Sequence, residues 1–558
     1  MNIVIGGSAG QGLVTIGELL AKSLVRSGYH IVVTQSYMSR IRGGHNTFAL
    51  RVSSEPVGAP TEAVDVLMAL NDETIALHRK DIVETGIIVV DEASKADEAG
   101  CLKTPYGTFG SKEHVNVAAL GVAGSLLGLD MACLADAVDR VFGKKKPEMA
   151  EAIRQVLAKA YEWSAATQIT RFRLNPVPSS ALRLTMTGND AIALGANSAG
   201  VRFCAFYPMT PSTSIPLSLV KHGDAAGVIV EQAEDEIAAI NMAIGASFAG
   251  ATAMVATSGG GFALMVEGVS LAAMTETPLV IVVGQRPAPA TGLPTRTEQS
   301  DLEFVLHAGH GEFPRAVFTP GSVEECYHLT RQAFALAEKY QGPIFLLTDQ
   351  FLADSYRAVA PFDLPDDRPA ASDTKAEEVP YNRFRITDTG ISPRLLPGAS
   401  RNLVVVDSDE HTEDGHPTED LDMRRRMVEK RLRKLAGLRS ETIPPQFRGD
   451  GDPDLLLVCW GSSLGAVAEA AASMSRGGRR VGVLHFPQAW PLVPAQFMDT
   501  LQAAGEVVCV EGNATAQFAR LLRRETGFEV NGTVLRYDGL PFTPEFIVKG
   551  VESWRNNR

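Results

Sequence analysis

Short apolar runs alternate along this chain with longer segments whose apolar positions recur at helical spacing. In the first part of the chain, one helical pattern covers 13–27 and another covers Pro147 to Ala166. The apolar runs around them predict four strands, at 2–5, 31–34, 66–70 and 87–90. Strands that alternate with helices are typical of an α/β fold.

Two later segments repeat this alternation. The second segment is apolar throughout each of its predicted strands, as in a parallel sheet covered on both faces. These strands are predicted at 228–230, 252–256, 279–283 and 344–347. The third segment begins at Asp454 with DLLLVCWGSS and continues through VGVLHFP and EVVCVEG, which again indicates an α/β arrangement.

Stretches without periodicity separate the segments and predict the domain boundaries. Prolines break the pattern over 171–187, which we interpret as a linker. Residues 362–452 are rich in Asp, Pro and Arg and predict an extended connection. Within it, the basic run MRRRMVEKRLRKLAG predicts a solvated or intersubunit helix. The sequence therefore predicts three α/β domains, over 1–170, 188–361 and 453–558.

Composition narrows the class of protein. Of the 558 residues, 45% are hydrophobic and 21% are charged, as expected for a globular protein of several domains. The net charge of -13 argues against nucleic acid as a partner. Residues 238–265 carry no charge, but polar residues and glycines interrupt them, so they predict a buried helix and strand rather than a membrane span. The chain begins with a strand and a glycine loop instead of an export signal, and we expect a cytoplasmic protein.

The cysteines are scattered. No two of them have the short spacing of an iron–sulfur or zinc site, so we expect this chain itself to bind no metal. Cys459 and Cys509 lie inside apolar runs and are expected to be small buried hydrophobic residues. The six positions are Cys101, Cys133, Cys204, Cys326, Cys459 and Cys509.

The loop GGSAGQG follows the first predicted strand and opens the first helix, so its backbone amides could bind an anion. Its glycine order differs from a dinucleotide fingerprint, and the second strand ends without an acidic residue, which argues against NAD. A tight turn without a ligand is an equal alternative. The candidate residues in this loop are Gly10 and Gly12.

A second cluster follows at SYMSRIRGGHN. Arg40, Arg42 and His45 place cations beside flexible backbone, which suits either a phosphate or carboxylate contact or a charged interface. The sequence favours neither interpretation over the other.

The second segment holds the most informative motifs. In YPMTPSTSI, two prolines bracket Thr210, although an ordinary proline-rich turn would look the same. Glu236 begins an uncharged helical run that is expected to be buried, where a carboxylate needs a partner. Arg286 stands immediately after a predicted buried strand, at the sheet edge where α/β proteins bind ligands.

These motifs carry a family resemblance. YPMTPSTSI, EQAEDEIAAINMAIGASFAG, TSGGGF, GQRPAPATGLPTRTEQSDL and HGEFPR together resemble the alpha subunit of the 2-oxoglutarate:ferredoxin oxidoreductases, a group of 2-oxoacid:acceptor oxidoreductases. GGSAGQG and RIRGGHN resemble the family's gamma domain, fused at the N-terminus. EGNATAQFARLLR and YDGLPFTPE resemble its transketolase-like C-terminal domain, so the resemblance covers the whole chain.

The resemblance implies oxidative decarboxylation of 2-oxoglutarate with coenzyme A to succinyl-CoA, with electrons passing to ferredoxin. It gives Glu236 the role of activating thiamine diphosphate, with Glu231, Glu234 and Asp235 as nearby competitors. Substrate binding falls to Thr210, Arg286 and Arg296. The residues implied to bind the cofactor are Tyr207, Pro208, Thr210, Glu236, Ser258 and Gly259. Those implied for coenzyme A or an interface are Gly10, Gly12, Arg40, Arg42 and His45.

The resemblance also implies partners. A beta subunit would share the thiamine diphosphate and hold Mg²⁺ and a [4Fe-4S] cluster, in an (αβ)₂ assembly that reduces ferredoxin. The distal carboxylate of 2-oxoglutarate would need a second cation, from Arg296, Arg42 or His45. The family's TSGPG and QRGGPSTG read TSGGG and QRPAPATG here, so Gly260 and Pro287 bear on the preferred substrate. The alternatives are a branched-chain or aryl 2-oxoacid substrate, a non-catalytic interaction subunit and a nucleotide-binding dehydrogenase.

Overall fold

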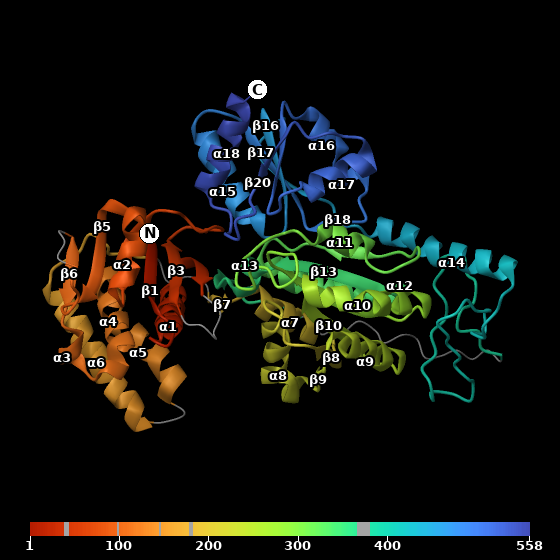
Figure 1. The fold of residues 1–558 in the computed structure, drawn as a ribbon, viewed down its shortest axis with the longest axis horizontal. Coiled ribbons are helices and arrows are strands. Elements are labelled where there is room, and N and C mark those ends of the chain that lie inside the picture. Colours follow the sequence, from red (N-terminus) through yellow and green to blue (C-terminus); the bar gives the residue numbers. More distant parts are fainter. Residues whose placement is uncertain (38–43, 97–99, 144–146, 178–181, 365–379, 558) are drawn as a thin grey trace. The chain divides into compact units, whose positions relative to one another are not determined.

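The computed structural model describes residues 1–37, 44–96, 100–143, 147–177, 182–364 and 380–557. It divides the chain into two compact units. The first contains 1–187, 354–362 and 543–545, and the second contains the remaining described residues. Each unit is a mixture of helices and sheets, which confirms the predicted α/β class (Figure 1).

The first unit is built on a sheet of eight strands in the order β6-β5-β4-β1-β3-β2-β14-β7. The main core lies between one face of this sheet and the helices α1, α4, α5 and α6. The strands are β1 (Asn2–Ser8), β2 (His30–Ser36), β3 (His45–Ser53), β4 (Val64–Ala69), β5 (Ile82–Asp91), β6 (Cys101–Thr104), β7 (Leu184–Met186) and β14 (Arg357–Val359). The helices are α1 (Leu13–Arg26), α2 (Asp72–His78), α3 (Tyr106–Phe109), α4 (Val115–Leu127), α5 (Met131–Val138) and α6 (Pro147–Ala166).

The four predicted strands of this unit and both predicted helices are confirmed, and strands that the pattern did not indicate complete the sheet. β3 lies antiparallel between β1 and β2. Its sequence HNTFALRVS alternates buried and half-buried positions and contains several polar residues, so no long apolar run indicates this strand. β14 pairs antiparallel with β2 and β7. The predicted linker at 171–187 and the end of the predicted second domain therefore each contribute a strand to the first sheet.

The second unit holds a seven-stranded sheet in the order β18-β12-β13-β11-β10-β8-β9. Its strands are β8 (Phe203–Phe206), β9 (Ile229–Gln232), β10 (Ala253–Ser258), β11 (Leu279–Gln285), β12 (Ala316–Phe318), β13 (Pro343–Asp349) and β18 (Gln488–Trp490). Its helices are α7 (Gly188–Ser198), α8 (Ser214–Ala226), α9 (Glu236–Phe248), α10 (Gly259–Met274), α11 (Leu302–His307), α12 (Val323–Tyr340) and α13 (Gln350–Asp354). β10, β11 and β13 are buried throughout, as predicted for a covered parallel sheet.

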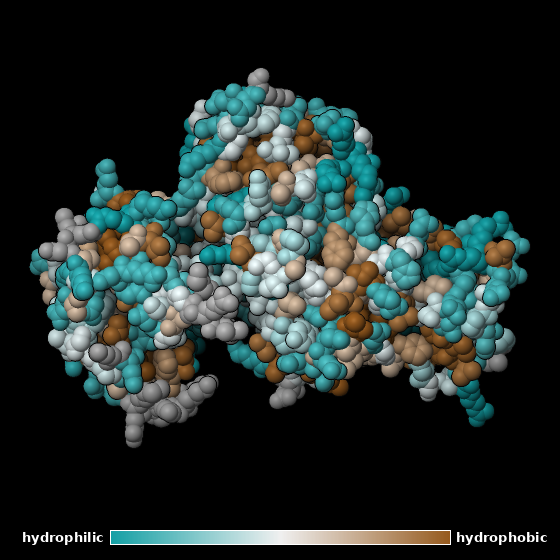
Figure 2. Space-filling view, viewed as in Figure 1, coloured by the Kyte–Doolittle hydropathy of each residue, from teal (hydrophilic) through white to brown (hydrophobic). Residues whose placement is uncertain are grey.

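The edge strand β9 and the helix α9 depart from the predicted burial. Ile229 in β9 is 63% exposed, and β9 is the end strand of the sheet in the described part of the chain. On α9, Ile237 and Met242 are also exposed, so only one face of the helix is buried. Figure 2 shows hydrophobic atoms gathered on the surface over α9 and α10. The prediction that the whole run from 238 is buried is therefore wrong for this face.

The C-terminal part of the second unit adds a five-stranded sheet in the order β15-β17-β16-β19-β20. The side chain of Gln299 joins it to the larger sheet: its Nε2 donates to Trp460 O at 3.1 Å, and its Oε1 accepts from Gly512 N at 2.8 Å. The strands are β15 (Gln446–Arg448), β16 (Leu455–Trp460), β17 (Val481–Phe486), β19 (Val507–Glu511) and β20 (Gly532–Leu535). The helices are α15 (Leu464–Arg476), α16 (Met498–Ala503), α17 (Gln517–Thr526) and α18 (Pro544–Asn556).

The basic run predicted as a solvated or intersubunit helix forms α14 (Leu421–Ser440), but one side of it is buried. Lys430 and Lys434 both form ion pairs with Glu276, and Lys430 Nζ lies 2.5 Å from Glu276 Oε1. This buried carboxylate explains why a helix with so many cations packs against the protein. No helix in the described part of the chain is both long enough and apolar enough to span a bilayer.

Candidate active site at the N-terminus of helix α10

Three consecutive glycines begin α10, and two buried carboxylates pack against them. A Cβ atom on Gly261 would lie 2.2 Å from Glu236 Oε1 and 2.2 Å from the hydroxyl oxygen of Thr257. A Cβ on Gly259 would lie 2.3 Å from Asp301 Oδ2. Both carboxylates therefore occupy space that a side chain on the helix would fill, and they meet the same turn of α10.

The middle glycine differs from its neighbours. The nearest atom to a Cβ on Gly260 is the carbonyl oxygen of Ala290, at 3.6 Å, which is ordinary van der Waals contact. This is the position at which the family motif TSGPG carries proline. This chain therefore departs from the family motif at a position where a side chain fits. At the first and third glycines a side chain would overlap neighbouring atoms.

Glu236 is positioned by the start of α9. Asp235 caps the helix by accepting from Ala238 N at 2.8 Å, so Glu236 is the first helical residue. Its side chain is 3% exposed, and Oε1 has no hydrogen-bond partner within the described residues. Burial raises the pKa of this carboxyl group, and the charge of Asp235 adds to the shift. A buried carboxyl oxygen without a partner, with a raised pKa, suits exchange of a proton with a ligand.

Arg286 follows the buried strand β11, as predicted, and its guanidinium is itself buried. Its Nη1 donates to the carbonyl oxygen of Thr210 at 2.8 Å. Burial lowers the pKa of Arg286, and the nearby Asp301 partly opposes that effect. The loop that carries Thr210 is fixed by Asn189, whose Nδ2 donates to Pro211 O at 2.9 Å. A buried cation beside an anchored loop can bind a small carboxylate.

The other predicted site residues of this unit lie in three kinds of surroundings. Ser258 is fully buried, caps α10 without a side-chain hydrogen bond, and its Oγ has no partner among the described residues. Tyr207 and Pro208 are exposed. Arg296 is half-buried and packs beside Gly539 of the C-terminal part. The structure thus brings Thr210, Glu236, Ser258, Gly259 and Arg286 to the start of α10, whereas Arg296 lies against another element.

The candidate residues of the first unit form a separate group. Gly12 caps α1 in a left-handed conformation, with φ at 72°, and no side chain caps that helix. Gly10 precedes it with open space where a Cβ would lie. His45 contacts His78, with 3.1 Å between their Nε2 atoms, and burial followed by the charge of His78 lowers its pKa. Arg40 and Arg42 lie outside the described residues.

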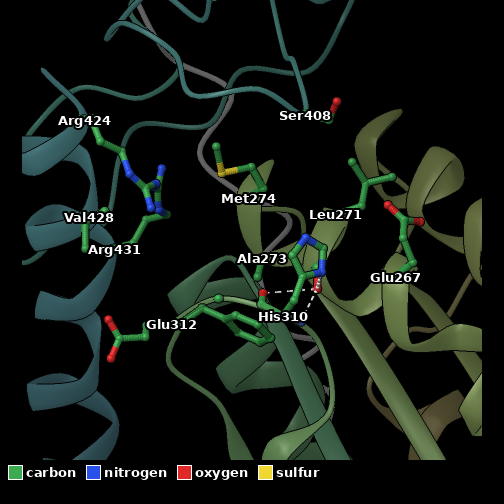
Figure 3. A pocket seen from close by; sticks show the side chains of 13 residues that line it. Glu267, Leu271, Ala273, Met274, His310, Glu312, Ser408, Arg424, Val428 and Arg431 are labelled. Atoms are coloured by element: carbon green, nitrogen blue, oxygen red, sulfur yellow. Dashed lines mark hydrogen bonds between the residues drawn. The ribbon is translucent and has the colours of Figure 1, made fainter. Parts of the chain in front are cut away.

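A cavity of about 360 Å³ elsewhere in the second unit does not involve these residues. It lies between the C-terminal half of α10, the segment 310–313 and α14. In Figure 3, Arg424 and Arg431 project from α14 toward it. Both cations bind the one carboxylate of Glu410. The cavity contains none of the predicted site residues.

Asp301 and Gly261 are site residues that the sequence did not single out. Asp301 stands in the motif TEQSDL after four other polar residues, so nothing in the pattern indicates that it is 7% exposed. Gly261 resembles any glycine in a loop. The one available signal was the motif TSGGGF directly after an apolar strand, which predicts a tight approach of some group to the backbone.

Two protein-family models match this chain. One, described as pyruvate flavodoxin/ferredoxin oxidoreductase, thiamine diP-bdg, matches 194–430, which includes Thr210, Glu236 and Arg286. The other, described as pyruvate ferredoxin/flavodoxin oxidoreductase, matches 2–163. A thiamine-diphosphate-binding family domain therefore covers the candidate site.

Known proteins resemble nearly the whole chain. A 2-oxoacid:ferredoxin oxidoreductase subunit alpha from Sulfolobus sp is 32% identical and covers 97% of this chain and 94% of its own length. A 2-oxoglutarate synthase subunit KorA from Methanothermobacter marburgensis is 33% identical over 65% of this chain and 97% of its own. The solved structure of 2-oxoglutarate:ferredoxin oxidoreductase from Magnetococcus marinus, with 2-oxoglutarate, coenzyme A and succinyl-CoA bound, is 30% identical, covers 99% of both chains and has a TM-score of 0.93. The resemblance inferred from the motifs is confirmed, and the chain belongs to the alpha subunits of the 2-oxoacid:ferredoxin oxidoreductases.

Proposed function

We propose that this alpha subunit acts on 2-oxoglutarate, which it helps to decarboxylate oxidatively with coenzyme A to succinyl-CoA while electrons pass to ferredoxin. Two relatives support this substrate: the Methanothermobacter protein is named a 2-oxoglutarate synthase subunit, and the Magnetococcus structure contains 2-oxoglutarate. The observation that carries the proposal is the buried, unpartnered carboxyl oxygen of Glu236 inside the region that matches a thiamine-diphosphate-binding model.

Glu236 fits the aminopyrimidine ring of thiamine diphosphate. When bound, this cofactor supplies a carbon nucleophile that attacks the 2-oxo group and accepts the electrons released on decarboxylation. The role of Glu236 is to hold a proton between its carboxyl group and a ring nitrogen, since such a hydrogen bond favours the tautomer that activates the cofactor. Its raised pKa brings the carboxyl group closer to sharing that proton. Ser258, whose buried hydroxyl also lacks a partner in the described chain, would provide a second polar contact.

Arg286 and Thr210 would bind the substrate. A guanidinium holds a carboxylate through two parallel hydrogen bonds, which fixes the adjacent ketone for attack. The Thr210 carbonyl already orients Arg286, and the Thr210 hydroxyl would contact the 2-oxo group. Arg296 is a candidate for the distal carboxylate of 2-oxoglutarate.

A beta subunit would cover the exposed apolar face next to Glu236. Four large hydrophobic residues of this face are between 42% and 63% exposed: Ile237 and Met242 of α9, Leu264 of α10 and Ile229 of β9. A group of exposed hydrophobic side chains is unusual on a protein surface and marks a site of contact with another protein. The partner would hold the diphosphate, Mg²⁺ and the [4Fe-4S] cluster and would pass electrons to ferredoxin, in an (αβ)₂ assembly. The first unit, with Gly10, Gly12 and His45, would contact coenzyme A or another subunit.

A panel of 2-oxoacids tests the substrate. The chain would be purified with its beta subunit, and ferredoxin reduction dependent on coenzyme A would be measured with 2-oxoglutarate, pyruvate, a branched-chain oxoacid and an aryl oxoacid. The proposal expects kcat/KM to be at least about 100-fold higher for 2-oxoglutarate, because a paired distal carboxylate discriminates strongly against substrates without one. Equal or higher values for branched-chain or aryl oxoacids would instead assign the enzyme to those substrates.

A further inference from the structure

The loop between β8 and α8 carries Thr210 and is held against the sheet by direct contacts. Arg286 Nη1 donates to the carbonyl oxygen of Thr210 at 2.8 Å, and Asn189 Nδ2 donates to the carbonyl oxygen of Pro211 at 2.9 Å. The ring of Pro211 packs closely on β11, because a Cβ atom on Gly284 would lie 3.0 Å from Pro211 Cγ. The main chain of the loop is therefore fixed at two consecutive carbonyl oxygens.

Asn189 is itself held in one orientation. It is the second residue of α7 and is fully buried. The helix begins against the backbone of α13, since a Cβ atom on Gly188 would lie 2.5 Å from Leu352 O. Besides its bond to Pro211, Asn189 Nδ2 donates to the hydroxyl oxygen of Ser214, the first residue of α8, at 2.7 Å. The two N–H groups of this amide thus join the start of α7 to the loop and to the helix that follows it.

The remaining polar atom of Asn189 indicates that its role is not stability alone. Its Oδ1 is buried and has no hydrogen-bond partner among the described residues. A buried acceptor without a partner destabilises a fold, so an apolar side chain of the same size would fill this space at a lower cost. What an asparagine adds at this position is the direction of its N–H groups toward the loop.

We propose that Asn189 is a positioning residue that fixes the Thr210 hydroxyl where it binds the 2-oxo group of the substrate. This inference rests on the proposed function, in which Thr210 contacts that group. Without Asn189, the buried carbonyl oxygen of Pro211 loses its donor and the loop shifts toward another one. A small shift of a group that orients the substrate is enough to weaken binding and catalysis.

The variant Asn189→Leu keeps a side chain of similar size and removes both hydrogen bonds. We expect the KM of the assembled enzyme for 2-oxoglutarate to rise about tenfold, because the substrate must restore the position of the Thr210 hydroxyl when it binds. The KM for coenzyme A should stay at the parent value, since Thr210 has no role in binding it. A merely structural loss would instead lower kcat through a smaller folded fraction and leave both KM values unchanged.

A double-mutant cycle with Thr210→Val shows whether Asn189 acts through the Thr210 hydroxyl. Thr210→Val removes that hydroxyl at nearly constant volume and should itself raise the KM for 2-oxoglutarate. When Thr210→Val is already present, Asn189→Leu should raise KM further by less than about threefold, because no hydroxyl remains to be positioned. If Asn189 acted elsewhere in the protein, the two effects would multiply.

Two further variants complete the experiment. Ser247→Ala is the matched control, because Ser247 is also fully buried in this unit and its Oγ donates to a proline carbonyl, Pro278 O, at 2.6 Å. It should lower the free energy of unfolding and leave the KM for 2-oxoglutarate unchanged. If Asn189→Leu does not fold, Asn189→Asp replaces it. Ser214 can donate to the new carboxylate, whereas Pro211 O meets an acceptor instead of a donor, so the same rise in KM is expected.

The outcomes separate this inference from the proposed function. A parent KM for 2-oxoglutarate in the folded Asn189 variant, or a tenfold rise that persists in the presence of Thr210→Val, would overturn the role of Asn189. If Thr210→Val raises KM and the Asn189 variant does not, only that role fails. If Thr210→Val leaves KM unchanged, the substrate assignment of Thr210 fails, and the inference about Asn189 fails with it.

Discussion

At the scale of single residues, the site depends on two glycines of α10, which have no side chain. The side chains of Glu236 and Asp301 fill the places that Cβ atoms on Gly261 and Gly259 would take. The sequence predicted a functional carboxylate at Glu236 because a charge begins an apolar helix. It gave no means to predict the glycine contact or the burial of Asp301, because both depend on how loops far apart in the chain meet.

Gly261→Ala should therefore damage the enzyme in a way that Gly260→Ala does not. The new methyl group would overlap Glu236 Oε1 and the Thr257 hydroxyl, and Glu236 would have to move. We expect ferredoxin reduction by the assembled enzyme to fall by about 100-fold or more, as for other displaced proton-transfer groups.

Gly260→Ala is the matched control, one residue away on the same turn. Its methyl group meets no atom closer than 3.6 Å, and alanine favours a helix over glycine by about 0.8–1 kcal/mol. Activity should stay at the parent level, and thermal unfolding should shift upward. Equal losses of activity in the two variants would contradict the role assigned to Gly261.

At the scale of elements, α14 shows where a sequence pattern misleads. Its run of arginines and lysines is typical of a solvated face, yet Lys430, Lys434 and Met427 are buried. The missing information was the position of Glu276, more than 150 residues earlier in the chain, whose carboxylate lies between the two lysines. Burial would raise the pKa of Glu276, but Lys434, Lys430 and Arg383 outweigh it and hold the pKa well below its usual value. Burial lowers the pKa of Lys430 to about 8, although the charge of Glu276 acts in the opposite direction.

Glu276→Gln should strongly destabilise the second unit, because it leaves two buried cations without their shared counter-charge. Removing one partner of a buried ion pair costs about 3–5 kcal/mol. Glu429→Gln, on the exposed side of α14, is the control and should change the unfolding free energy by less than about 0.5 kcal/mol. Denaturant unfolding measures both. A loss of under about 1 kcal/mol in Glu276→Gln would show that the ion pairs contribute little.

At the scale of the whole molecule, the sequence predicted the α/β class and most strands of the seven-stranded sheet, because continuous apolar runs are a strong signal. It predicted three other strands less well. β9 is exposed, β3 alternates in burial, and β14 returns to the first sheet after the second domain has begun. Each of these strands depends on contacts made by distant parts of the chain rather than on its own pattern.

Stability should also depend on pH through His485 of β17. Its ring is fully buried against Gly321, and burial, with a smaller effect of Arg448, lowers its pKa to about 3. The unfolded chain binds the proton near pH 6.5, so the stabilisation is complete above that pH and is lost progressively as pH falls below it. From pH 7.5 to pH 5 the loss should be about 2 kcal/mol.

Denaturant unfolding at pH 7.5 and pH 5 measures this contribution. In His485→Gln, the difference between the two pH values should be about 2 kcal/mol smaller than in the parent chain. His222→Gln, which removes an exposed histidine, should leave the difference unchanged. An equal pH dependence in the parent and in His485→Gln would show that His485 does not stay neutral on folding.

If Glu236 activates the cofactor, its replacement must slow the release of carbon dioxide from 2-oxoglutarate by the assembled enzyme. Glu236→Gln keeps the size of the side chain and removes its acidic group, while Glu234→Gln changes an exposed carboxylate two residues earlier. We predict a fall of about 10²- to 10⁴-fold in Glu236→Gln and the parent rate in Glu234→Gln. Carbon dioxide release at the parent rate by Glu236→Gln would contradict it.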